Sequence, residues 1–362
     1  MWETLKRQKK NMSKLIAGVD PISAPWSDDV RDTASEKVRF GLVTPVRDEE
    51  AFIGAMIESV VAQTARPLRW IIVDDGSRDK SVDIIREYER RFGFIRLLQL
   101  PPREQRFFGG ECAASIGLRE LAGEDLEYIA RFDADLVFPP DHFARIFEEC
   151  IANPKLGIAG GGLYVERNGA LVIESRAPNH VRGALKVYRR RCLEEIGGLA
   201  EGVGWDTLDE VTAWVNRWET RTFENVEAVH RRPTGQATPP NRLYHARGRA
   251  EFLTWSHPLF VVAKAVKIAV TQHSAMKPIF YLMGFLTGYA LGERRPHEPA
   301  IARARRAQQW KRIVAIASRP RREKPMGPTQ QISPRCSISA SVKPKQESTS
   351  TMSNGHLCTR SN

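Results

Sequence analysis

The sequence predicts an α/β fold in which helices flank a doubly wound, mostly parallel sheet, with a hydrophobic helical segment toward the C-terminus. Two observations indicate this class. Between residues 38 and 135, strand-like apolar runs alternate four times with segments whose apolar residues recur at helical spacing or that begin with glycines. Three of the strand-like runs also end in polar or acidic residues, which is typical of the ligand-binding edge of an open α/β sheet.

The elements follow one another in a simple order. A strand is expected at 38–46 and a helix at 47–64, where the apolar positions are Phe52, Ile53, Met56, Ile57, Val60 and Val61. A second strand from residue 68 leads into a helix at 80–92, and a third at 94–100 leads into a helix at 109–122. The fourth strand, Tyr128–Phe132, closes the series.

Charge and cysteine content limit the classes of function. The net charge of the 362 residues is +12, but residues 293–362 hold fifteen Lys or Arg and only four Asp or Glu, so the rest of the chain carries about +1. The basicity therefore belongs to the tail and does not indicate a nucleic-acid-binding fold. Five scattered cysteines without C-x-x-C spacing indicate neither a disulfide framework nor a zinc site, and they fit a reduced, cytoplasmic protein. No apolar signal-peptide segment is evident near the N-terminus.

The composition divides the chain into five segments. We expect a flexible leader at 1–37, a main domain at 38–240 with halves at 38–135 and 136–240, hydrophobic helices at 241–292, a basic helix at 293–318 and a disordered tail at 319–362.

The hydrophobic segment raises a question of membrane contact. The apolar runs 257–270 and 277–292 are too short to span a bilayer, so they are either interfacial helices or a core hairpin. The basic residues that follow favour an anionic membrane surface: Arg294, Arg295, Arg303, Arg305, Arg306, Lys311 and Arg312. Nucleic acid is not expected as a partner, because Trp310 is the one aromatic residue of this cluster that could stack on a base.

Asp133 and Asp135 are the first candidate site residues. They follow the strand Tyr128–Phe132, where their carboxylates could hold a divalent cation, Mg²⁺ or Mn²⁺, together with a diphosphate. The structural alternative is a solvated turn that Pro139 and Pro140 end.

Two other strand ends carry polar residues. The first includes Thr44, Pro45, Val46, Arg47 and Glu49, and the second includes Asp75 and Gly76. Asp75 could accept hydrogen bonds from a base or a ribose, and Gly76 permits a tight turn. The same residues could instead form a helix N-cap turn. Neither a dinucleotide-binding glycine motif nor a P-loop is present.

As an ordered set, these motifs resemble the family-2 glycosyltransferases with the GT-A fold, over residues 38–235. The resemblance implies that Thr44, Val46, Arg47 and Glu49 line the base and ribose pocket and that Asp75 reads the base. It also implies that Asp133 and Asp135 hold ribose, metal and diphosphate and that His230 completes the metal site. Taken alone, a histidine at a strand end is usually structural.

The second half should supply a general base for an inverting transfer. The family usually carries Glu-Asp at the start of a helix. Counting back from Arg217-Trp218 places the base at Asp206, with Trp205 in place of the glutamate, whereas a shift by one helical turn selects Asp209. Both aspartates could also be helix-capping or helix-dipole residues.

Arg182 and Gly183 are further candidates for contact with the donor. The resemblance implies that Gly183 lets the backbone approach the donor sugar, and Arg182 could meet phosphate. Trp214 stands where a processive synthase would have glutamine, so processive synthesis is not expected.

These observations predict a glycosyltransferase that uses a nucleotide-sugar donor and a glycan or lipid-linked acceptor. We expect it to be cytoplasmic and peripheral or interfacial at the inner membrane face, and to act in cell-surface polysaccharide or glycoconjugate synthesis. The alternatives are a catalytically silent nucleotide-sugar-binding scaffold, which the loss of the glutamate before Asp206 favours, and a nucleotidyltransferase, which the lack of a glycine-rich loop after the first strand disfavours.

Overall fold

The computed structural model describes residues 38–101, 111–174, 180–200, 202–233, 235, 238–293, 295 and 299–317. The leader expected at 1–37 and the tail expected at 319–362 lie outside these ranges. All described residues belong to one compact unit of the chain.

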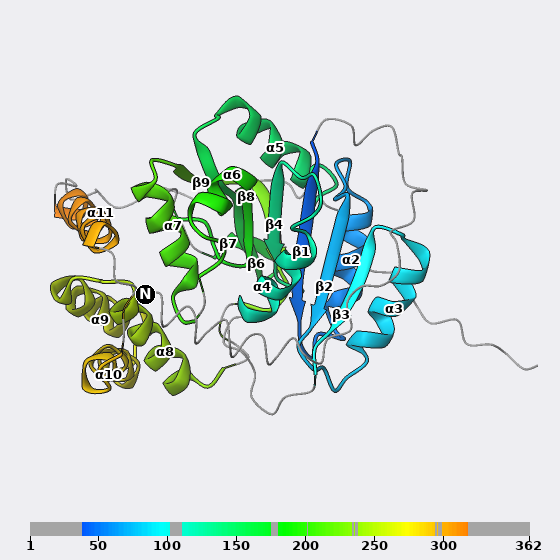
Figure 1. Cartoon of the computed structure of the whole chain (residues 1–362). Coiled ribbons are helices and arrows are strands. Elements are labelled where there is room, and N and C mark those ends of the chain that lie inside the picture. The colour runs from blue at the N-terminus through cyan, green and yellow to red at the C-terminus, as the bar shows by residue number, and fades with distance from the viewer. Residues whose placement is uncertain are drawn as a thin grey trace, which may run out of the picture. The chain divides into compact units, whose positions relative to one another are not determined.

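The described residues build one sheet of nine strands in the order β3-β2-β1-β4-β8-β6-β9-β5, with β7 paired to β6 (Figure 1). The strands are β1 (Phe40–Val46), β2 (Arg69–Asp74), β3 (Ile95–Gln99), β4 (Tyr128–Phe132), β5 (Leu136–Val137), β6 (Leu156–Arg167), β7 (Ala170–Ile173), β8 (Leu185–Arg189) and β9 (Glu219–His230). The four strands predicted from the sequence are all present.

The direction of the strands differs between the two halves of the sheet. β3, β2, β1 and β4 run parallel, as predicted. β8 is antiparallel to both β4 and β6, β6 and β9 are parallel, and β5 is antiparallel to β9. The α/β class is therefore confirmed, but the second half is mixed rather than mostly parallel. Strand direction follows from long-range pairing, which local hydrophobic pattern does not encode.

Helices cover both faces of the sheet, which explains why a strand such as β2 buries apolar side chains on both of its sides. In β2, Trp70 and Ile72 pack in one core cluster while Ile71 and Val73 pack in the other. The helices of this part are α2 (Ile53–Val61), α3 (Ser81–Arg91), α4 (Glu111–Glu120), α5 (His142–Ala152), α6 (Arg190–Glu195) and α7 (Trp205–Val215).

Four further helices follow the sheet: α8 (Pro240–Leu253), α9 (Pro258–Gln272), α10 (Met276–Ala290) and α11 (Pro299–Ala317). α8 and α10 cross with their backbones in contact. A Cβ on Gly248 would lie 1.8 Å from the Tyr281 carbonyl oxygen, and one on Gly284 would lie 1.9 Å from that of His245. Larger side chains at these two glycines would force the helices apart.

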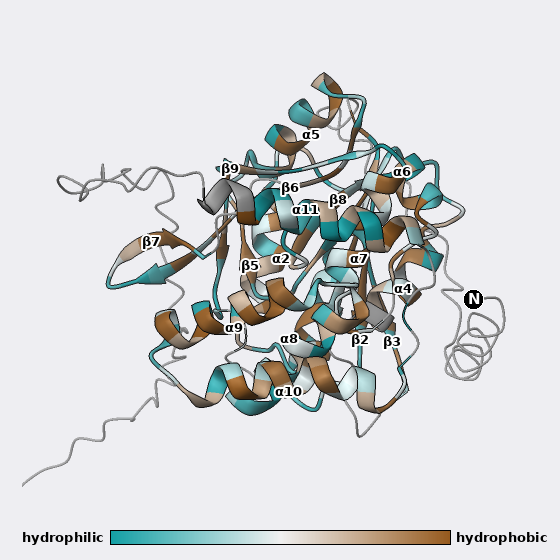
Figure 2. Cartoon of the chain, turned by 90° about the vertical axis from the view of Figure 1, so that its left-hand side faces the viewer, coloured by the Kyte–Doolittle hydropathy of each residue, from teal (hydrophilic) through white to brown (hydrophobic). Residues whose placement is uncertain are grey.

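α9 and α10 carry apolar residues, coloured brown in Figure 2, and several of their side chains are exposed. We call these residues the outer apolar face, and each is between 47% and 67% exposed: Leu259, Val262, Val266 and Val270 of α9, and Met276, Ile279, Met283 and Leu286 of α10. Within the described residues, none of the helices has both the length and the hydropathy needed to cross a bilayer. Both α9 and α10 are therefore amphipathic. One side of each helix packs in a core cluster with α8, and the other side is exposed.

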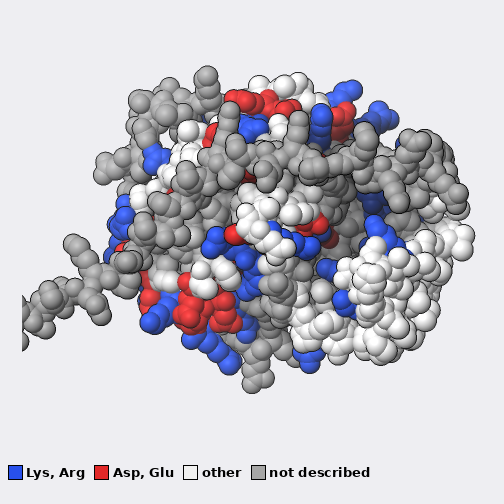
Figure 3. All heavy atoms as spheres, turned by 180° about the vertical axis from the view of Figure 1, so that it is seen from behind, with Lys and Arg blue, Asp and Glu red and all other residues white. Residues whose placement is uncertain are grey.

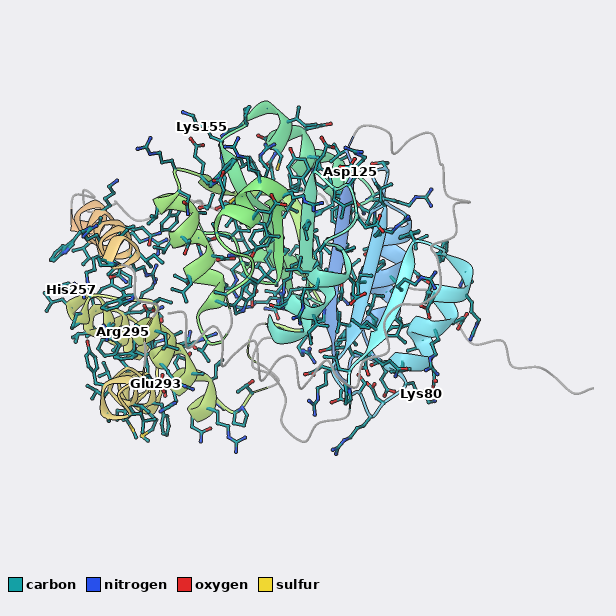
Figure 4. The ribbon with its side chains drawn as sticks, in the orientation of Figure 1. Lys80, Asp125, Lys155, His257, Glu293 and Arg295 are labelled. Carbon is teal, nitrogen blue, oxygen red and sulfur yellow. The ribbon has the colours of Figure 1, made fainter. Side chains whose placement is uncertain are left out.

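Two of the basic residues expected at a membrane surface point inward instead. The Arg295 guanidinium (labelled in Figure 4) lies 3.7 Å from the ring centre of Phe252 and 4.6 Å from that of Trp255. Arg305 of α11 is buried, with its Nη2 3.5 Å from Glu251 Oε2. These two arginines hold the helices together rather than extend the basic surface.

Candidate active site

Asp135 and His230 are brought together by the pairing of two strands. Leu136 of β5 lies opposite His230 of β9 in antiparallel register, which places Asp135 beside the imidazole. His230 Nε2 lies 3.3 Å from Asp135 Oδ1, and the Arg231 amide donates to the Asp135 carbonyl oxygen at 2.8 Å. Two of the three predicted metal ligands are therefore neighbours.

Two arginines accompany the aspartates. Arg131 Nη1 lies 2.6 Å from Asp133 Oδ1, and Arg232 Nη2 lies 3.2 Å from Asp135 Oδ2. The Asp133 side chain is 36% exposed, whereas that of Asp135 is only 7% exposed. Asp135 is thus more enclosed than a solvated turn residue, and part of its negative charge is balanced by the protein itself.

The charge of His230 is set by the carboxylates around it. Its Nδ1 lies 3.2 Å from Glu174 Oε2, on the opposite side from Asp135. Burial works to lower the pKa of His230, but the hydrogen bonds to Asp135 and Glu174 outweigh it and raise the pKa to about 9. The ring is therefore protonated at neutral pH in this arrangement.

Asp133, Asp135 and His230 would need further ligands to hold a divalent ion. Nowhere in the described ranges do three His, Cys, Asp or Glu side chains converge as a metal site. The donor chemistry nevertheless fits Mg²⁺ or Mn²⁺, because carboxylate oxygens of Asp133 and Asp135 and a deprotonated His230 are suitable ligands. Phosphate oxygens of a bound diphosphate would complete such a site.

Sequence reasoning missed Glu174 and Arg232. Glu174 follows β7 in an irregular segment, and only the pairing of β6 with β7 returns it to the sheet edge. Arg232 lies in a bend directly after β9, so strand alternation could not have placed it beside Glu49 and Asp135.

The predicted donor residues of β1 and β2 meet where these parallel strands end. Arg47 Nη1 lies 3.7 Å from Asp75 Oδ2, and both side chains are almost enclosed. The Asp75 amide donates to the Val46 carbonyl oxygen at 2.8 Å, and Gly76 has a φ of 79°, the left-handed conformation expected for it.

Other residues of the predicted pocket lie deeper. Thr44 is fully buried and its hydroxyl accepts a hydrogen bond from the Trp70 indole at 3.0 Å, while the Val46 side chain is 1% exposed. Glu49 is bound to Arg232, and Pro45 is half-buried. Thr44 and Val46 therefore pack inside the sheet, and Glu49 ties the first strand end to the segment after β9.

Gly183 joins the acidic strand end to the proposed base. Its carbonyl oxygen accepts a hydrogen bond from Arg131 at 2.5 Å, the same guanidinium that holds Asp133. A Cβ on Gly183 would lie 3.1 Å from Asp206 Cβ and 3.5 Å from its Oδ2. Asp206 therefore lies beside the loop that Arg131 and Asp133 contact, and a side chain at residue 183 would press on it.

The structure gives the two candidate bases opposite surroundings. Asp206 is half-buried, while Asp209 is 2% exposed and accepts hydrogen bonds from Lys186 Nζ at 2.9 and 3.0 Å and from the Tyr188 hydroxyl at 2.5 Å. Burial raises the pKa of Asp209 to about 6, against the influence of Lys186. Asp209 has its hydrogen-bonding capacity taken up inside the protein.

Comparison with known proteins identifies the family that part of the chain matches. The model of the family described as Glycosyl transferase family 2 matches residues 42–197. Residues 42–197 therefore match the family-2 glycosyltransferases, and the resemblance seen in the sequence is confirmed.

Three characterised or named relatives are similar over part of their length. The chain is 28% identical over 184 residues to the dodecaprenyl-phosphate galacturonate synthase of Rhizobium johnstonii, which is 46% of this chain and 52% of that protein. It is 31% identical over 123 residues (34% and 33%) to the glycosyltransferase EpsJ of Bacillus subtilis, which is uncharacterized. It is 29% identical over 111 residues (30% and 32%) to an undecaprenyl-phosphate 4-deoxy-4-formamido-L-arabinose transferase of Serratia proteamaculans. The alignments thus span about half or a third of these relatives.

Solved structures with a similar fold have lower sequence identity to this chain than these relatives. A mannosyltransferase from Pyrobaculum calidifontis in complex with GDP-Man and Mn²⁺ gives a TM-score of 0.47 at 19% identity, covering 85% of this chain and 86% of that one. S. aureus TarS 1–349 in complex with UDP-GlcNAc gives 0.45 at 15% identity, covering 74% and 79%. These likenesses are too distant to transfer a ligand or a residue role.

Proposed function

We propose that this protein transfers a sugar from a nucleotide-sugar donor to a hydroxyl group of a glycan or lipid-linked acceptor, with a divalent metal and with inversion at the anomeric carbon. The observation that carries the proposal is the connection from Asp133 through Arg131 and Gly183 to Asp206. It brings a diphosphate-binding edge and a candidate general base to opposite sides of one loop.

The donor would lie over the ends of β1, β2 and β4. Asp75 and Arg47 would contact base and ribose, and Asp133, Asp135 and His230 would hold Mg²⁺ or Mn²⁺ with the diphosphate. When bound, the metal neutralises charge on the departing nucleotide diphosphate. Arg131 and Arg232 would add positive charge at the same edge, so that the leaving group meets several cations at once.

Asp206 would take the proton of the attacking hydroxyl. A retaining reaction by double displacement would need a second carboxylate as nucleophile. Asp209 and Glu210 are the nearest carboxylates on α7, but Asp209 is bound by Lys186 and Tyr188, and Glu210 accepts from the Val181 amide at 2.6 Å. A single displacement with one base therefore fits this helix best.

The acceptor and the location of the enzyme are suggested by two further observations. The names of two relatives describe transfer to, or synthesis of, a polyprenyl phosphate product. The outer apolar face also offers a surface suited to the interface of a lipid bilayer, and exposed basic residues lie near it in sequence: Lys267, Arg303, Arg306 and Lys311. We therefore place the protein in the cytoplasm, peripheral at the inner membrane face.

Nucleotide sugars screened with Mg²⁺, Mn²⁺ or a chelator test this function. The proposal expects one donor to raise the melting temperature and to be hydrolysed or transferred, in both cases only with metal, and the released sugar to have inverted anomeric configuration by NMR. Metal-dependent donor binding without any turnover on lipid-linked or glycan acceptors would instead identify a nucleotide-sugar-binding scaffold, which the tryptophan before Asp206 favours.

A further inference from the structure

Trp205 is the first residue of α7, and its indole ring lies against the loop that contains Gly183. Only 7% of this tryptophan is exposed. A Cβ on Gly183 would lie 3.1 Å from Cζ2 of the ring. Gly204, the residue before Trp205, has a φ of 89°, a left-handed conformation that favours glycine. The entry into α7 therefore places a large aromatic side chain inside the candidate site.

Two cations approach the indole ring of Trp205. The guanidinium carbon of Arg131 lies 4.9 Å from the ring centre, and Lys186 Nζ lies 5.6 Å from it. Both distances are within the ~6 Å over which the negative face of an aromatic ring attracts a cation. All three residues are buried, so little water competes with this attraction, which is stronger here than at a surface.

The same two cations hold other parts of the candidate site. Arg131 Nη1 lies 2.6 Å from Asp133 Oδ1 and donates a hydrogen bond to the Gly183 carbonyl oxygen at 2.5 Å. Lys186 Nζ donates to the carbonyl oxygen of Asp206 at 2.6 Å. Since Arg131 belongs to β4 and Lys186 to β8, the indole ring is a common contact of two neighbouring strands and the loop before β8.

We propose that Trp205 is a positioning residue for donor binding: its ring holds the Arg131 guanidinium, and Arg131 in turn orients Asp133 toward metal and diphosphate. This inference rests on the proposed function. Asp133 would have to share its carboxylate between Arg131 and a metal ion. Because the ring attracts the guanidinium independently of Asp133, Arg131 would keep its position when the metal takes part of that charge.

The first test compares side chains with and without an aromatic ring at residue 205. Calorimetry with Mn²⁺ measures the affinity of wild type, Trp205→Phe and Trp205→Leu for UDP, GDP, ADP, CDP and dTDP. For the diphosphate that binds wild type, we expect Trp205→Leu to weaken binding at least about tenfold. Trp205→Phe should weaken it less, since phenylalanine keeps a ring that attracts cations more weakly than indole does.

The matched control is Trp214→Leu, which removes a half-buried tryptophan near the other end of α7 and should leave the affinity unchanged. The outer apolar face, part of the broad uncharged area at the right of Figure 3, contains none of the substituted residues. The titrations can therefore be done without lipid.

The second test separates the charge distribution of the ring from its packing. Fluorinated tryptophan nearly keeps the size and apolarity of the indole, but the fluorines withdraw electron density from the face that attracts cations. All eight tryptophans are replaced together, so Trp205→Phe made with the same analogues reports the effect of the others. We expect the affinity of wild type to fall stepwise with the number of fluorines and that of Trp205→Phe to stay constant.

Three results would overturn the inference: equal affinity of wild type and Trp205→Leu, equal losses in Trp205→Leu and Trp214→Leu, or fluorination that leaves wild type unchanged or weakens both fluorinated proteins equally. If Trp205→Leu does not fold, the fluorinated proteins decide alone, because they keep the packing of the ring. If none of the five nucleoside diphosphates binds wild type with Mn²⁺, the proposed function itself fails, and the inference fails with it.

Discussion

At the residue scale, two aspartates one turn apart on α7 differ in their suitability as a general base because their neighbours differ. Asp206 and Asp209 share a residue type and a helix, yet Asp206 stands beside Gly183 while Asp209 is enclosed by Lys186 and Tyr188. A general base must be able to approach a substrate and exchange its proton with solvent. The sequence could not choose between them, because the choice depends on β8, which lies twenty residues upstream.

Replacing Asp206 tests this assignment. We expect Asp206→Asn to reduce turnover by roughly 10²–10⁴-fold with nearly unchanged donor affinity, since a general base acts on the acceptor proton and not on the nucleotide. Steady-state kinetics and nucleotide calorimetry provide the two measurements. An active Asp206→Asn protein together with a stably folded but inactive Asp209→Asn protein would reverse the assignment.

Asp135→Asn tests the metal edge. The asparagine keeps the size of the side chain but removes the charge beside His230 and Arg232, so metal-dependent binding of nucleotide diphosphate should be lost while the fold persists. Calorimetry with and without Mn²⁺ measures the first effect, and circular dichroism the second. The same affinity for the nucleotide in mutant and wild type, with metal present, would contradict it.

The sequence predicts a site at the acidic strand end and its histidine, but it does not reveal the charged residues that the structure places beside them. Asp133 and Asp135 are visible because two carboxylates interrupt an apolar pattern, and His230 follows from the family motif. No sequence pattern indicates Glu174 or Arg131. Arg131 lies within the buried strand β4, and its role is clear only from the structure, where it contacts Asp133 and Gly183.

At the scale of elements, β8 and α7 are joined by a buried charge network. Lys186 Nζ binds Asp209 and also donates to the Asp206 carbonyl oxygen at 2.6 Å, and it lies 3.5 Å from Glu210 Oε1. The carboxylates outweigh burial and raise the pKa of Lys186. The network therefore fixes the first turn of α7, and with it Asp206, against the sheet.

Removing this lysine should be costly. Lys186→Met leaves Asp209 without its counter-ion, so we expect a loss of about 3–5 kcal/mol in the free energy of unfolding, measured with urea. The double variant Lys186→Met/Asp209→Leu should recover part of it, because the carboxylate that Lys186 Nζ approaches most closely is removed as well. Lys155→Met, at the exposed position labelled in Figure 4, is the control and should change little. No recovery in the double variant would indicate that lost packing, not charge, caused the effect.

A second buried charge connects the last four helices. Glu251 of α8 binds Lys264 of α9, Arg305 of α11 and Ser256. Burial would raise the pKa of Glu251, but the two cations lower it to about 2.

This shift has a defined pH dependence. Because the folded pKa lies below the usual value of 4.5, the stabilisation is fully present above about pH 4.5 and is lost as the pH falls toward 2. Glu251→Gln should therefore be less stable than wild type near pH 7, by an amount on the order of 3 kcal/mol, and the difference should shrink between pH 4.5 and 2. Unfolding measured across this range tests it, with the exposed Glu87→Gln as control. A difference that stays constant with pH would exclude the charge as its cause.

Helices and strands were predicted best where the strands that follow one another in the sequence also run parallel in the sheet. In the first half, the parallel strands β1, β2 and β3 are each followed by a helix, so the apolar periodicity of the sequence predicts the sheet directly. In the second half, β6, β7 and β8 turn back on one another, and their direction depends on distant partners. The short strand β5 was not expected, since two residues carry no pattern.

At the scale of the whole molecule, the outer apolar face is the largest feature that the fold leaves unexplained. Eight apolar side chains on two adjacent helices face away from the core, on the side opposite the glycine contacts with α8. The sequence predicted either interfacial helices or a core hairpin, and the structure combines the two, with one side packed and one side open.

Substitutions on this face test membrane binding without disturbing the packed side. The triple variant Val266→Ser/Met283→Ser/Leu286→Ser should reduce sedimentation with anionic liposomes by roughly tenfold or more, because three exposed apolar side chains no longer enter the lipid. Ile151→Ser, a similarly exposed apolar residue on α5, is the control. Retention of full liposome binding by the triple variant, or competition by RNA, would contradict the membrane proposal.

The close crossing of α8 and α10 at their glycines also limits the distance between Asp206 and a membrane bound by the outer apolar face. Backbones in contact at Gly248 and Gly284 bring α8 as near to the outer apolar face as two helices allow, and Gly204 then sets the first turn of α7 against α8. Packed helices are separated by about 8–10 Å, so on the membrane proposal Asp206 would stand only ~20 Å above the lipid surface. An enzyme of this build would elongate short, lipid-proximal saccharides and would lose efficiency as the acceptor chain grows away from the bilayer.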